Sequence, residues 1–85
     1  MRPVAGLQVQ VDPTGSLELS VPGSATQLTG DTEATAMWIA LTSHHWNVGD
    51  AAVALAGIWE VDPWVLRDDM CSWIGALVNA GILQD

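Results

Sequence analysis

The sequence predicts an α+β fold in which a three-stranded antiparallel sheet is followed by three helices. In the first third of the chain, apolar and polar residues alternate with a period of two, which is typical of half-buried strands. After Gly30 the apolar residues instead recur every three or four positions, which is typical of amphipathic helices. A chain of 85 residues has room for a single modest core, so we expect one domain over 1–85.

The strands are expected at about 7–11, 16–21 and 24–28. The first two (LQVQV and SLELSV) keep the strand period, and the turn sequence Asp12-Pro13-Thr14-Gly15 joins them into a hairpin. Pro22-Gly23 marks the next turn. The third strand (SATQL) has small and polar side chains, so we expect it at the edge of the sheet.

The helices are expected at about 31–43, 48–59 and 63–80. Thr29 or Asp31 is a candidate N-cap for the first helix, and Asn47 is one for the second. Asp62-Pro63 starts the third, because Asp is a good N-cap and Pro is favoured at the first helical position. Three strands beside three helices make a winged-helix-like arrangement.

The charge of the chain limits its partners. Only two basic residues, Arg2 and Arg67, stand against ten acidic ones, and the net charge is −8. Nucleic-acid binding depends on basic residues that neutralise phosphates, so no nucleic-acid partner is expected. The acidic surface favours cationic partners or serves solubility alone.

The sequence gives no indication of a membrane partner, an enzyme, a metal or a cofactor. No apolar run reaches the length of a membrane span, and the N-terminus lacks the features of a signal peptide. The single Cys71 forms no internal disulfide and is expected to pack on the third helix, so a cytoplasmic location is favoured. The adjacent His44 and His45 make a poor chelate and are expected in a solvated turn.

The third strand raises two open interpretations. Sheet edges are usually protected by Lys, Pro or a bulge, and residues 24–28 contain none of these. The segment is therefore either a short, weak strand or an edge that accepts a guest peptide by strand addition. In the second case the peptide-binding residues are Ser24, Ala25, Thr26, Gln27 and Leu28.

Five stretches at particular spacings bear on this choice. They are Leu28-Thr29, Glu33 to Trp38, Asn47 to Ala51, Val61-Asp62-Pro63 and Ala80-Gly81-Ile82-Leu83. In their order and spacing they resemble the PqqD-like family, whose members are RiPP precursor peptide recognition elements (RREs). The resemblance covers nearly the whole chain. Glu33 stands where the family has Gly and Thr29 where it has Asn, and both departures are expected outside the peptide groove.

The resemblance implies a function. Such domains bind the leader segment of a ribosomally synthesised precursor peptide and present it to a modifying enzyme. This chain looks most like the discrete leader-binding protein of split lasso-peptide systems, whose partner is a separate leader peptidase of the cysteine-protease type. The resemblance implies a leader with Tyr and Pro as apolar anchors. The alternatives are a PqqD-like peptide chaperone for a radical-SAM pathway, a winged-helix transcription regulator and a structural or carrier domain.

The third helix is expected to form the second wall of a peptide groove beside the edge strand. The candidate residues on this helix are Val65, Leu66, Asp68, Asp69, Met70 and Trp73. Asp69 interrupts an otherwise apolar stripe, and a carboxylate buried without a partner is costly. We therefore expect Asp69 to be partly exposed and to receive a Lys, an Arg or a backbone N–H from the leader.

Overall fold

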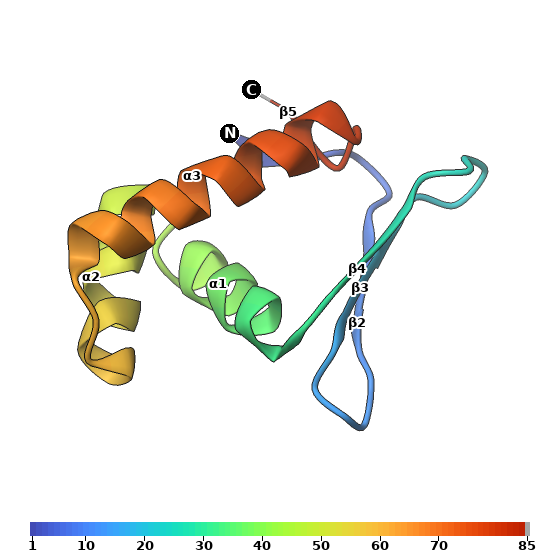
Figure 1. The fold of residues 1–85 in the computed structure, drawn as a ribbon. Coiled ribbons are helices and arrows are strands. Elements are labelled where there is room, and N and C mark those ends of the chain that lie inside the picture. Colours follow the sequence, from blue (N-terminus) through green and yellow to red (C-terminus); the bar gives the residue numbers. More distant parts are fainter. Residues whose placement is uncertain (85) are drawn as a thin grey trace.

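The computed structural model describes residues 1–84 and has the predicted α+β class (Figure 1). The sheet β2–β3–β4 precedes all three helices, so the predicted order of strands and helices is confirmed. The elements are, in chain order, β1 (Arg2–Pro3), β2 (Gln8–Val11), β3 (Leu17–Ser20), β4 (Gln27–Gly30), α1 (Thr32–Ser43), α2 (Val48–Trp59), α3 (Pro63–Asn79) and β5 (Leu83–Gln84).

The third strand lies later than expected. It covers Gln27–Gly30 instead of 24–28, and it pairs antiparallel with β3 so that Gln27 lies opposite Ser20. Residues 24–25 belong to the β3–β4 turn. There the hydroxyls of Ser24 and Thr26 hydrogen-bond at 2.9 Å, and the Thr26 N–H donates to Ser24 Oγ at 3.2 Å. Such local side-chain bonds compete with the strand ladder, which explains the shift.

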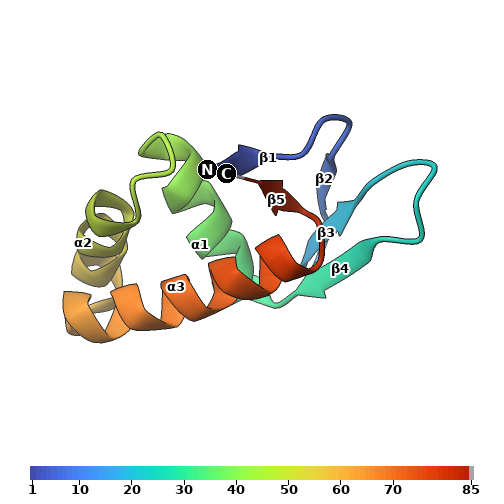
Figure 2. The same cartoon turned by 90° about the horizontal axis from the view of Figure 1, so that it is seen from above.

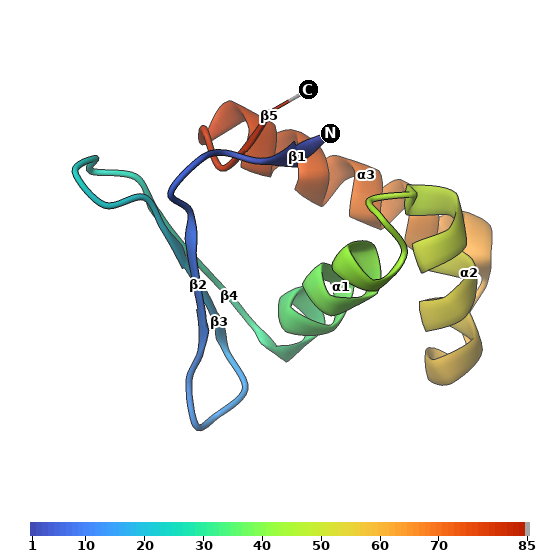
Figure 3. The ribbon, with the colours of Figure 1, turned by 180° about the vertical axis from the view of Figure 1, so that it is seen from behind.

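A two-stranded sheet of β1 and β5 was not predicted. It pairs Arg2 with Gln84 and Pro3 with Leu83, and so brings both ends of the chain together (Figure 3). Gly81, at φ +81°, turns the chain back after α3. Strands of two residues have no visible period, so the sequence pattern could not reveal them. None of the helices within residues 1–84 is long and apolar enough to cross a membrane.

The core lies between β3 and the three helices. Leu17 and Leu19 of β3 are buried together with Leu41 of α1 and Met70 of α3. Trp38 of α1 packs edge-on against Trp46 at 5.1 Å and against Trp73 at 6.5 Å between ring centroids. Edge-to-face packing of this kind is favourable for aromatic rings, so these three indoles hold α1 against α3 and the α1–α2 turn.

The junction between β4 and α1 is tightly fixed. Asp31 caps α1, because its carboxylate accepts the Ala34 N–H at 2.9 Å. The buried Thr35 hydroxyl donates to the Gly15 carbonyl at 2.7 Å and ties the β2–β3 turn to the same helix. A Cβ on Gly30 would lie 2.5 Å from the Ala34 Cβ, so only glycine lets β4 approach α1 this closely.

The turn between β2 and β3 is organised by Asp12. Its carboxylate accepts hydrogen bonds from the Thr14 hydroxyl, from the Ser16 N–H at 2.9 Å and from the Thr14 N–H at 2.9 Å. These bonds, the Thr14 hydroxyl foremost, lower the pKa of Asp12 from its ordinary value because they favour the ionised carboxylate.

We expect Gly30→Ala to destabilise the protein and Gly75→Ala to stabilise it. The first change forces β4 away from α1, which typically costs about 1–3 kcal/mol. Gly75 lies in α3 with nothing within 4 Å of an added Cβ, so alanine there is worth about 0.5–1 kcal/mol of helix propensity. Thermal unfolding followed by circular dichroism measures both. Equal melting temperatures for the two variants would contradict the tight junction.

Candidate functional site

Within the described part of the chain, β4 pairs on one side only. The order of the sheet is β2–β3–β4, so β4 and β2 form its two edges. Seen from above, β4 lies on the same side of the molecule as α3, whereas β2 lies on the side of β1 (Figure 2). The free edge of β4 therefore lies on the α3 side of the sheet in this view.

The register shows which backbone groups of β4 point outward. The Val21 N–H donates to the Thr26 carbonyl at 3.2 Å, so Thr26 faces β3. Bonding in an antiparallel ladder alternates from one residue to the next. Leu28 and Gly30 therefore bond to β3, while Gln27 and Thr29 direct their N–H and C=O groups away from it. These two residues present the free edge.

A cavity of about 410 Å³ opens between the start of α1 and the start of α3. We call it the α1–α3 cavity. Five of its lining residues are apolar, and Glu33 and Asp69 are the two carboxylates. The full lining consists of Glu33, Met37, Trp59, Val61, Val65, Leu66 and Asp69. Its first lining residue along the chain, Glu33, follows the end of β4 by three residues.

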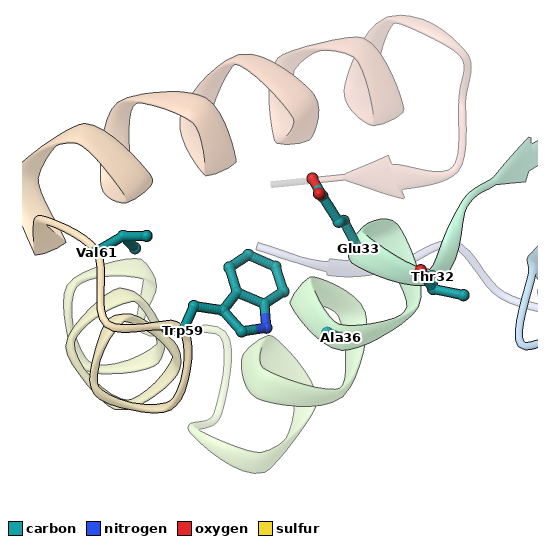
Figure 4. A pocket seen from close by; sticks show the side chains of 5 residues that line it. All are labelled: Thr32, Glu33, Ala36, Trp59 and Val61. Atoms are coloured by element: carbon teal, nitrogen blue, oxygen red, sulfur yellow. The ribbon is translucent and has the colours of Figure 1, made fainter.

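A second cavity of about 460 Å³ adjoins the first (Figure 4). We call it the Trp59 cavity. The Trp59 indole reaches from the end of α2 toward α1, and Glu33 points toward α3. Thr32 and Ala36 of α1 and Val61 of the α2–α3 connection complete the lining. Trp59, Val61 and Glu33 line both cavities, so the two form one continuous depression.

The candidate residues of the third helix fall into three groups. Val65, Leu66 and Asp69 line the α1–α3 cavity, and Asp69 is exposed as expected. Asp68 is also exposed but does not line the cavity. Met70 is completely buried beneath the surface, and Trp73 is half-buried against Trp38.

The candidate residues of the edge segment are also divided. Gln27 is an outward residue of β4, whereas Leu28 packs against the core. Thr26 precedes the strand and bonds to β3 through its carbonyl. Ser24 and Ala25 are exposed in the turn and form no part of the ladder. Of the five, Gln27 alone offers a free backbone donor and acceptor to a guest strand.

Four residues that line the α1–α3 cavity were not predicted: Glu33, Met37, Trp59 and Val61. Glu33 and Met37 are four residues apart on α1, so they share one face of the helix. The two departures from the family pattern were expected outside the peptide groove, but Glu33 lines both cavities and Thr29 lies on the free edge of β4. Positions at which a chain departs from its family's pattern can indicate where its own binding site differs, and these two departures were visible in the sequence.

The site is acidic and offers no sign of a metal centre. Among residues 1–84, no lysine or arginine lines either cavity, and the lining includes the carboxylates of Glu33 and Asp69. Within residues 1–84 no group of three His, Cys, Asp or Glu side chains is arranged to hold a metal. The expected packing of Cys71 was wrong, because its side chain is exposed on α3.

Comparison by sequence identifies no relative: no family model matches the chain, and none of the curated proteins matches it. Comparison by structure finds a solved structure described as TbiB1 in complex with the TbiA(beta) leader peptide. The two share 17% of residues at a TM-score of 0.85, over 99% of this chain and 95% of that chain. The resemblance predicted from the sequence is confirmed at the level of the fold: the chain has the fold of a protein whose solved structure contains a leader peptide.

Proposed function

We propose that the chain binds the leader segment of a ribosomally synthesised precursor peptide by strand addition to β4. The observation that supports this most directly is the free edge of Gln27 and Thr29, which is followed within three residues of the end of β4 by Glu33 in the wall of the α1–α3 cavity. Strand addition uses such an edge for backbone hydrogen bonds and a neighbouring pocket for side chains. The shared fold with TbiB1, which was solved with a leader peptide, supports the same proposal.

Backbone pairing alone is too weak for useful affinity. Two outward residues offer two donors and two acceptors, and four hydrogen bonds at about 0.5–1.5 kcal/mol each give roughly 2–6 kcal/mol. Ordering about eight peptide residues costs roughly 8–16 kcal/mol. Apolar anchors in the cavity must therefore contribute most of the binding, at about 1.5–3 kcal/mol for each fully buried side chain. Pairing sets the register of the leader, and the anchors set its affinity.

The walls of the cavity indicate the chemistry of the leader. Met37, Val61 and Val65 accept apolar anchors, for which Tyr and Pro are the residues implied by the family resemblance. Glu33 and Asp69 favour a Lys or Arg next to these anchors. The net charge of −8 adds a long-range attraction for a basic peptide.

In this proposal the chain delivers the leader to a separate leader peptidase of the cysteine-protease type, in a cytoplasmic lasso-peptide pathway. The second candidate is a PqqD-like chaperone for a radical-SAM pathway, which uses the same groove for a different enzyme. Co-purification of the chain with a co-expressed leader peptidase of the cysteine-protease type, in the presence of a leader peptide, separates the two. Capture of a radical-SAM enzyme instead would favour the second.

A transcription regulator is disfavoured by the charge of the third helix. The helix contains Arg67 as its one basic residue, next to Asp68 and Asp69. A recognition helix needs basic residues toward the phosphates. A gel shift at low salt that retarded random duplex DNA would reverse this conclusion.

We expect Asp69→Arg to weaken binding of the TbiA(beta) leader peptide by about tenfold or more, equal to about 1.4 kcal/mol. The change removes an acceptor from the α1–α3 cavity and fills the cavity with a long cation. Asp68→Arg is the matched control, because it makes the same charge change at the next residue outside the cavity. Fluorescence polarisation measures the affinity of both variants. An equal loss of affinity in the two variants would place the groove elsewhere.

We expect Gln27→Pro to abolish binding without unfolding the protein, because it removes an outward N–H that the β3–β4 ladder does not use. The matched control is Val9→Pro on the opposite edge. The Asp12 N–H donates to the Ser16 carbonyl at 3.0 Å, so by the same alternation Val9 faces outward from β2. This control should bind normally. A folded Gln27→Pro variant with full affinity would reject strand addition at β4.

A further inference from the structure

A third depression lies between α1 and α2, outside the site described above. Its volume is about 360 Å³, and we call it the α1–α2 groove. Ala36 and Ala40 of α1 and Ala54 of α2 are among its walls. Ile39 and Ile58 also line it, and their side chains are 56% and 75% exposed. Exposed apolar side chains around a floor of alanine residues are suited to bind another polypeptide chain.

The α1–α2 groove is continuous with the proposed leader site. Ala36 and Trp59 line both the α1–α2 groove and the Trp59 cavity. Trp59 also lines the α1–α3 cavity, so one indole is shared by all three depressions. Thr32, two residues after the end of β4, lines the Trp59 cavity. Neighbouring depressions thus share residues from Thr32, near the end of β4, to Ile58 in α2.

We propose that the α1–α2 groove binds the segment of the leader peptide that flanks the residues paired with β4. This inference rests on the proposed function and extends it by a second subsite. Helix α1 has 12 residues and is therefore about 18 Å long. An extended chain covers roughly 3.3–3.6 Å per residue, so about five flanking residues span the length of α1, past the Trp59 cavity and along the α1–α2 groove.

The lining of these depressions specifies the side chains of this segment. At the Trp59 cavity the flanking residue lies near Glu33, which favours a Lys or Arg. Farther along, Ile39 and Ile58 favour an aliphatic or aromatic residue. The segment should therefore contain a basic residue next to the strand and an apolar residue two to four positions farther out, by the spacing of an extended chain.

The test compares two peptides and two variants. The probes are two fluorescein-labelled peptides: the TbiA(beta) leader in full, and the same leader shortened from both ends to the strand-paired segment. The variants are Ile58→Asn and Val53→Asn. Val53 is the matched control, because it lies on the same helix, is 62% exposed, and lines a different cavity next to Trp64.

We expect Ile58→Asn to lower the affinity for the whole leader by about fivefold or more, equal to about 1 kcal/mol. It should leave the affinity for the shortened peptide unchanged, and Val53→Asn should change neither. Equal effects of Ile58→Asn on both peptides, or no effect on either, would overturn the second subsite while leaving strand addition intact. Failure of wild-type protein to bind either peptide would overturn the proposed function and this inference together. A dimer in size-exclusion chromatography that Ile58→Asn dissociates would assign the groove to a second copy instead.

Discussion

The unpaired edge of β4 is the constraint on which the rest of the structure depends. Among the described residues, Gln27 and Thr29 direct two N–H and two C=O groups toward solvent. Exposed edges invite pairing with other chains, and proteins usually block them. Here the edge strand instead runs into α1, whose first turn lines the two cavities. Gly30 fixes this arrangement, because its missing side chain lets β4 end directly against Ala34 of α1. The close contact between Gly30 and Ala34 therefore fixes the position of the free edge relative to the part of α1 that lines the cavities.

The opposite edge shows why exposed backbone alone does not make a peptide site. Val9 and Val11 of β2 also face outward and are 42% and 53% exposed. Neither of them, however, lines the α1–α3 cavity or the Trp59 cavity. Because hydrogen bonds return less free energy than the ordering of a peptide costs, an edge without pockets cannot hold one tightly. The position of Trp59, where the three depressions meet, therefore matters as much as the strand itself.

The sequence was informative wherever a period or a cap determines the structure. Strand alternation, helix spacing and the caps Asn47 and Asp62 predicted the order of the elements. The edge strand was misplaced because the Ser24 and Thr26 hydroxyls extend the turn, which alternation of polarity does not reveal. The site was predicted only in part, because a cavity depends on how helices meet. Val65, Leu66 and Asp69 follow from one helix face, whereas Trp59 joins them through the packing of α2 against α1.

The most direct test of the central claim is amide hydrogen exchange, measured by NMR with and without the leader peptide. Without peptide, the Gln27 and Thr29 amides should exchange quickly, because they face solvent and β3 does not bond them. With peptide, these two amides should become strongly protected, while those of Val9 and Val11 on the other edge stay fast. A leader that binds and leaves the Gln27 and Thr29 amides in rapid exchange would contradict strand addition at β4.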